Sequence, residues 1–179
     1  AFEPVDIVSK KLEQNIIMNK QENVTVVKKA IYEYNTVIHL HIANQENLGM
    51  SSIYRHDSES GSMMNVKAIT LDSYLKSESI HSIKLIKIDV EGAELPALKG
   101  MVETIERYRP ILMVEISPEV IKSEDERLKI FHFLEERKYE SFVIQNTGEL
   151  LPADLLRLNA YTNFVFESRS RIPRSSTSG

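Results

Sequence analysis

The sequence of 179 residues contains no cysteine, which excludes disulfide bonds, thiolate-bound zinc, iron–sulfur clusters and a cysteine nucleophile. Long hydrophobic runs are also missing, and stretches such as Ile111–Val114 are far too short to cross a bilayer. Glycine is scarce, with six residues, and no two of them form Gly-x-Gly. The chain therefore contains neither a dinucleotide-binding fingerprint nor a phosphate loop.

The balance of charge argues against a nucleic-acid partner. Lys and Arg number 22 and Asp and Glu 26, so the net charge is −4, whereas nucleic-acid binders usually carry a basic excess. Apolar residues make up 42% of the chain, which is enough for a sizeable core in one domain. The charge and the lack of cysteine are compatible with a cytoplasmic enzyme, which is the location we expect.

Hydrophobic periodicity predicts three helices, at 6–19, from about 93 to Pro110, and at 124–138, where Ser123 and Glu126 form a capping box. Residues 44–64 are predicted to form a long loop and 70–75 a short element of undecided type. Strands are predicted at 24–28, 36–42, 83–90, 111–116, 141–145 and 161–166.

The alternation of strands with helices indicates an α/β fold with a mostly parallel sheet and helices on both faces. A turn at 32–35 is predicted to join the first two strands as a hairpin, and 83–90 is predicted to be a buried strand. The last two strands are predicted to form an antiparallel pair at the sheet edge. Ligands of such sheets bind at the carboxyl ends of the strands.

The densest group of charges lies at one such end. Asp89, Glu91 and Glu94 stand within six residues, and Gly92 permits an unusual backbone angle between them. Acids are rarely buried unless they are paired, so we interpret Asp89 as a residue that orients a polar acceptor or holds a cationic group. Glu94 is better explained as a complement to a helix N-terminus.

Other acids and histidines are weaker candidates. Glu3, at the end of an early strand, is placed to accept hydrogen bonds from ribose hydroxyls. Glu115 ends the next strand and either faces the same crevice or pairs with Lys or Arg. His39 and His41 share one strand face, but no third ligand is apparent, so no metal site is predicted. His56 lies in the long loop as a general-base candidate, and no Gly-x-Ser-x-Gly surrounds Ser51 or Ser52 there.

The run Leu-Ile-Lys-Ile-Asp-Val-Glu-Gly-Ala-Glu-Leu at 85–95, with Leu-Lys-Gly at 98–100 and Arg-Pro-Ile-Leu-Met-Val-Glu at 109–115, resembles the FkbM family of S-adenosylmethionine-dependent methyltransferases. Phe2-Glu3-Pro4, Ser51-Ser52 and Thr70-Leu71-Asp72 fit the family in the same order. The resemblance covers about residues 2–168. It implies a class I methyltransferase fold, Rossmann-like, with an antiparallel last strand.

The resemblance also implies S-adenosylmethionine as cofactor, with Glu3 on its ribose, the 29–31 segment near its adenine and Asp89 near its sulfonium. The cofactor-binding residues expected on this basis are Glu3, Pro4, Lys29, Ala30, Ile31 and Asp89. The substrate-binding residues expected are Ser51, Ser52 and Glu115.

The activity implied is methyl transfer to oxygen on a sugar or natural-product scaffold. The partner expected is therefore a small-molecule or glycan acceptor, with no nucleic acid and no membrane span. Because the sulfonium is already electrophilic, the protein mainly positions the acceptor hydroxyl. A carboxylate removes the hydroxyl proton, and Asp89 or Glu91 is the predicted catalytic residue, ahead of Glu115 and His56.

The family's first strand and Gly-rich cofactor turn are absent, so we expect them upstream of Ala1. We predict a methyltransferase domain over 1–168, lacking that strand and turn, and a disordered tail over 169–179. Two alternatives stay open. One is a noncatalytic remnant or binding module that keeps the fold, and the other is a metal-dependent hydrolase using Asp89 and Glu91.

Overall fold

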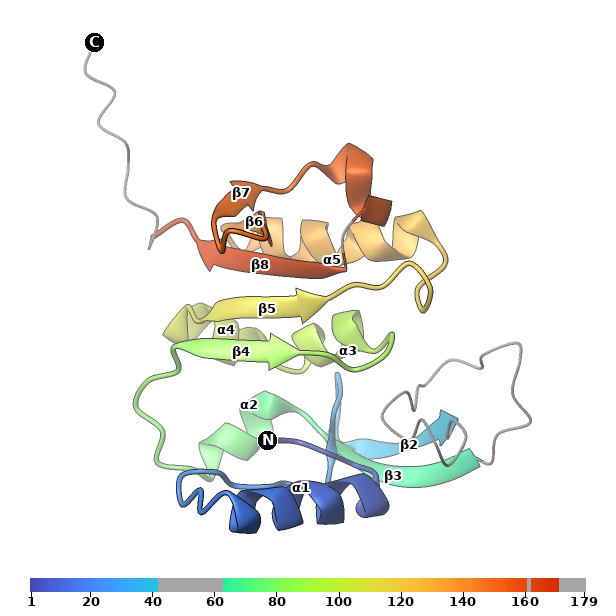
Figure 1. Cartoon of the computed structure of the whole chain (residues 1–179), viewed down its shortest axis with the longest axis vertical. Helices are drawn as coiled ribbons and strands as arrows, with labels where there is room; N and C mark the ends of the chain where they lie inside the picture. Colours follow the sequence, from blue (N-terminus) through green and yellow to red (C-terminus); the bar gives the residue numbers. More distant parts are fainter. Residues whose placement is uncertain (42–62, 161, 171–179) are drawn as a thin grey trace. The chain divides into compact units, whose positions relative to one another are not determined.

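The computed structural model describes residues 1–41, 63–160 and 162–170. The chain forms two compact units (Figure 1). The first comprises Ala1–Ser79 with Glu91–Val102, and the second comprises Ile80–Val90 with Glu103–Gly179. Each unit contains one sheet and is described by itself. Of the expected loop and tail, residues 42–62 and 171–179 lie outside the described part of the chain.

The first unit contains a three-stranded sheet in the order β1-β3-β2. Strand β1 pairs with β3 in parallel, and β2 pairs with β3 antiparallel. Its helices and strands are α1 (Asp6–Met18), β1 (Ala30–Ile31), β2 (Thr36–His41), β3 (Met63–Ile69), α2 (Leu71–Lys76) and α3 (Glu94–Lys99). Helix α1 and strand β2 match the predicted ranges closely.

The core of the first unit joins the N-terminal segment to the sheet. Val5, just before α1, packs with Leu40 of β2 and Val66 of β3, and all three are buried. The predicted alternation of β2 is confirmed, because Ile38 and Leu40 face this core while His39 is exposed. One face of β2 therefore packs in the core of the first unit, and its other face points away from that core.

Two predictions in this unit are wrong. Segment 24–28 contains only an isolated parallel bridge, between Val27 and Phe2, and 32–35 does not close a hairpin, because β1 and β2 both pair with β3 instead of with each other. The backbone N–H of Tyr32 donates to the carbonyl of Ile69, which holds the end of β1 beside β3. Strand β3 was not predicted, because Met63 and Met64 come directly after a polar stretch of sequence.

The helix predicted from about 93 to Pro110 is two helices, α3 and α4 (Val102–Tyr108). The chain breaks at Gly100, whose carbonyl accepts a hydrogen bond from the backbone N–H of Asp72, 3.2 Å away. The apolar spacing along the sequence gives no sign of a break at Gly100, because it continues from Leu98 to Ile105 and both side chains are fully buried. The break therefore comes from a tertiary contact that the spacing does not encode.

The second unit contains a five-stranded sheet in the order β4-β5-β8-β6-β7 (Figure 1). Besides α4 and a 3-10 helix at Leu155–Ala160, its elements are β4 (Leu85–Ile88), β5 (Ile111–Glu115), α5 (Glu124–Glu136), β6 (Tyr139–Ile144), β7 (Leu150–Pro152) and β8 (Asn163–Ser168). Ser123 caps α5 as predicted, accepting a hydrogen bond from the backbone N–H of Glu126.

The predicted antiparallel last strand is confirmed, since β8 runs antiparallel to both of its neighbours, β5 and β6. Parallel pairing is less extensive than predicted, because β8 lies between β5 and β6 and only β4–β5 is parallel in this sheet. The prediction that the last two strands lie at the sheet edge is wrong, because β7 pairs with β6 and forms that edge. The overall class is a mixed α/β fold.

One face of this sheet packs on α5. Figure 1 shows α5 lying along β8, and the ring of Phe131 contacts Phe164 at 5.0 Å and Phe166 at 5.3 Å between centroids. Leu112 and Val114 of β5 are fully buried on the same face.

Among the described residues, no helix is long and apolar enough to span a membrane.

Candidate functional site

The carboxyl ends of β4 and β5 bring together three charged side chains. Lys87 of β4 is in register with Met113 of β5, and the next pair is Ile88 with Val114. Side chains two apart on a strand share a face, so Lys87 and Asp89 lie on one face, and Glu115 lies on the same face of the neighbouring strand. The opposite face carries the buried Ile88 and Val114. Strand pairing thus collects the polar groups on one side.

These three side chains form one electrostatic group. The Lys87 Nζ lies 2.7 Å from Asp89 Oδ2, and the hydrogen bond to Asp89 raises the pKa of Lys87. Burial raises the pKa of Glu115, the charge of Asp89 and a hydrogen bond to it raise that pKa further, and Lys87 partly offsets the rise. An ammonium therefore neutralises one carboxylate beside a second carboxyl group that retains its proton more readily than usual.

The interpretation of Asp89 as a buried acid is wrong. Asp89 is exposed, with Lys87 as its partner, and β4 is the edge strand of its sheet, with Leu85 55% exposed. The prediction that 83–90 is buried on both faces is wrong for the same reason. Lys87 was not singled out by sequence reasoning, although its spacing of two from Asp89 on a strand is the signal that places both on one face.

Glu94 is the buried acid of this segment, with 2% exposure. It begins α3 as predicted, and its Oε1 accepts a hydrogen bond of 3.0 Å from the backbone N–H of Gly92. Two consecutive residues of the turn before it have positive φ, Glu91 at 48° and Gly92 at 99°. This turn is sharp, and glycine at its second position avoids steric strain there.

The predicted cofactor-binding residues of the first unit gather around Val27. Its carbonyl accepts hydrogen bonds from the backbone N–H of Glu3 at 3.0 Å and of Lys29 at 2.9 Å. Pro4 follows Glu3, and Ala30–Ile31 form β1 directly after Lys29. The structure therefore brings Glu3 and Lys29 close together along the backbone, through Val27.

The Glu3 carboxyl is half-buried and oriented. Its Oε1 accepts a hydrogen bond of 2.8 Å from the backbone N–H of Val5. Burial raises the pKa of Glu3, and the Val5 hydrogen bond partly offsets this rise. Within the described ranges, Glu3 Oε2 has no hydrogen-bond partner. A carboxylate fixed through one oxygen in this way can present the other to a pair of vicinal hydroxyls.

The remaining candidates lie elsewhere. Ser51, Ser52 and His56 are outside the described residues. His39 lies on the exposed face of β2, where its Nδ1 is 2.6 Å from Asn65 Oδ1. In the part of the chain that the structure describes, no group of three or more His, Asp or Glu side chains is arranged to hold a metal ion.

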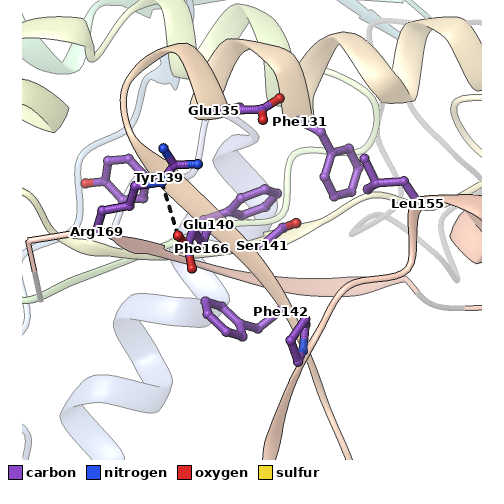
Figure 2. A pocket seen from close by; sticks show the side chains of 10 residues that line it. Phe131, Glu135, Tyr139, Glu140, Ser141, Phe142, Leu155, Phe166 and Arg169 are labelled. Carbon is purple, nitrogen blue, oxygen red and sulfur yellow. Dashed lines mark hydrogen bonds and ion pairs between the residues drawn. The ribbon is translucent and has the colours of Figure 1, made fainter. Parts of the chain in front are cut away.

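A pocket of about 260 Å³ lies between α5, β6 and β8 (Figure 2). Its lining includes the aromatic side chains of Phe131, Tyr139, Phe142 and Phe166. It also includes the Arg169–Glu140 ion pair at 3.1 Å. None of the predicted site residues lines it. Arg169, the first residue of the predicted tail, is thus paired with β6.

The site and fold are those of a mixed α/β protein with polar groups at the carboxyl ends of neighbouring parallel strands. The family model described as "Methyltransferase FkbM domain" matches residues 1–141. The chain therefore belongs to the FkbM methyltransferase family, as the sequence resemblance predicted.

A solved structure agrees with this family. The chain resembles the methyltransferase FkbM from Methylobacillus flagellatus KT with a TM-score of 0.54 and 16% identity, over 93% of this chain and 35% of that one. At this identity the likeness shows the fold. The chain thus spans about a third of the length of that methyltransferase. A search of curated proteins finds no match.

Proposed function

We propose that the protein transfers a methyl group from S-adenosylmethionine to an oxygen atom of a sugar or natural-product acceptor. The observation that carries the proposal is the hydrogen-bonded Asp89–Glu115 pair beside Lys87 in a chain of the FkbM methyltransferase family. A carboxylate that neighbouring side chains hold in place at the end of a strand can accept a hydroxyl proton. The family itself supports the methyl transfer.

The first unit supplies a suitable group for the cofactor. Glu3 is fixed through Oε1 by Val5, so Oε2 is the atom proposed to accept the ribose hydroxyls. Pro4 and the 29–31 segment, joined to Glu3 through Val27, are proposed to contact the nucleoside. When bound, the cofactor would supply a methyl group attached to a positively charged sulfur. An oxygen nucleophile would attack the methyl carbon, and the neutral thioether would leave without further activation of the donor.

The second unit supplies the proposed base. Asp89 accepts the proton of the acceptor hydroxyl while that oxygen takes the methyl group. Lys87 orients Asp89 by pairing with Oδ2, and Glu115 is proposed to form a hydrogen bond with the acceptor. Glu91 is the second candidate for the base, and Ser51 and Ser52 are proposed to bind the acceptor.

Titration calorimetry with S-adenosylmethionine tests the cofactor assignment. The chain and, where the gene encodes residues before Ala1, the longer product are both titrated. We expect the product that binds to lose at least tenfold in affinity on Glu3→Ala, and to be unchanged by Glu22→Ala, an exposed acid of the same unit. Absence of binding by both products, or equal affinities for the two variants, contradicts the proposal.

A further inference from the structure

The outer face of β2 and β3 carries two imidazoles, an amide and a thioether that the proposed methyl transfer does not use; the His41 imidazole is half-buried and the others are exposed. We propose that His39, His41 and Met63 form a binding site for a copper(I) ion, with Asn65 orienting His39.

The hydrogen bond fixes the tautomer of His39. Its Nδ1 lies 2.6 Å from Asn65 Oδ1, and an amide oxygen can only accept, so Nδ1 carries the proton. In the neutral ring the lone pair is then on Nε2. Histidines that bind metal ions usually donate their other ring N–H to a carbonyl or carboxylate in this manner. The hydrogen bond to Asn65 therefore fixes the ring of His39 with Nε2 available to bind a metal ion.

The register of β2 and β3 supplies the further ligands. His39 pairs with Asn65, and His41 pairs with Met63. His41 lies two residues beyond His39 on the same face, about 7 Å away at Cα, and Met63 lies about 5 Å from His41 across the pair. Sequence spacing shows only the two histidines, because Met63 comes from a strand 22 residues later.

The ligand atoms favour copper. Imidazole nitrogen binds zinc, copper and nickel, whereas a thioether sulfur selects copper(I). No carboxylate faces this group from either strand, since the other outward positions are Val37 and Lys67. The Lys67 ammonium lies at the far end, opposite Val37, and disfavours highly charged ions. A singly charged soft cation with neutral ligands fits this face.

Competition with a chromophoric copper(I) chelator, without oxygen, measures the site. The wild-type chain is expected to bind one copper(I) ion at this face. His39→Gln and His41→Gln should each lower the affinity at least tenfold, and Met63→Leu should lower it for copper(I) while leaving zinc(II) binding unchanged. Asn65→Leu should lower the affinity about 10- to 100-fold, as expected when the orienting partner is lost.

His132→Gln is the matched control, because it removes an exposed imidazole of the second unit and should not change the affinity. Diethyl pyrocarbonate labelling of the wild type provides a measurement that needs no variant: copper(I) should protect His39 and His41, but not His132, from modification. Failure of the wild type to bind, unchanged affinity in both histidine variants, or no protection of His39 and His41 overturns the proposal.

Discussion

Gly100 lies directly against the carbonyl group of Tyr32. A Cβ placed on residue 100 would lie 1.9 Å from the Tyr32 oxygen and 2.8 Å from its carbonyl carbon. Backbone atoms cannot yield as a flexible side chain can, so only glycine fits here. The same residue ends α3 and holds Asp72 at the start of α2. This contact therefore fastens the end of α3 to the strand segment of the first unit.

Gly100→Ala should destabilise the first unit by about 1–3 kcal/mol, because the added methyl group forces the backbones apart. Urea unfolding followed by circular dichroism measures the change. Lys99→Ala is the matched control, since it removes only an exposed ion pair with Glu33, which contributes little. Equal unfolding midpoints for the two variants would show that the contact is not as close as described.

Arg127 is a buried structural residue of the second unit, with 3% exposure. Its Nη1 donates to the carbonyls of Ile121 and Lys122, and its Nη2 donates to Asn159 Oδ1 at 2.7 Å. Arg127→Met should cost about 1–3 kcal/mol, because the buried Ile121 carbonyl loses the guanidinium donor. Lys129→Met on the same helix, which breaks only an exposed ion pair, should be nearly neutral in urea unfolding.

The contribution of Glu115 to the free energy of unfolding should decrease as the pH rises. Its pKa is raised from 4.5 in the folded chain, so the folded state binds this proton more tightly than the unfolded state does. The resulting stabilisation is complete below pH 4.5 and is lost as the pH rises through the raised pKa. Unfolding in urea across this range should show a larger loss in the wild type than in Glu115→Gln, in which Glu3, whose pKa is also raised, still contributes.

Two further variants make this prediction specific. Lys87→Met should raise the pKa of Glu115 further, because Lys87 is the group that lowers it; carbon NMR of the side-chain carboxyl follows this directly. Glu119→Gln, an exposed acid nearby in the sequence, should leave the pH dependence of the wild type in place. A Glu115 pKa at or below 4.5 would refute the described carboxyl pair.

The sequence predicted the helices and strands whose position is set by neighbouring residues in the chain. The Ser123 cap and apolar periodicity located α5, and the apolar run after Pro110 located β5. Strand β3 was missed because Met63 and Met64 follow a polar stretch, and its stability comes from pairing with two other strands. The position of β8 between β5 and β6 likewise depends on pairing that spacing along the chain does not reveal.

The candidate site was predictable in composition and less so in geometry. The carboxyl end of a buried run pointed to Asp89, and strand alternation explains why Lys87 joins it. Which acid is buried was not predictable, because the burial of Glu94 follows from the sharp turn at Glu91 and Gly92. The proximity of Glu3 to Lys29 was also not predictable, because it depends on backbone hydrogen bonds from both residues to the Val27 carbonyl.

Transfer of a labelled methyl group from S-adenosylmethionine tests the central proposal most directly. The full-length product of the gene is assayed with sugar and natural-product acceptors that carry free hydroxyl groups, alongside Asp89→Asn, Glu91→Gln and the control Glu119→Gln. We predict that Asp89→Asn lowers turnover about 100-fold or more, as expected for loss of a general base, and that Glu119→Gln does not. Wild-type turnover in both Asp89→Asn and Glu91→Gln would contradict the account.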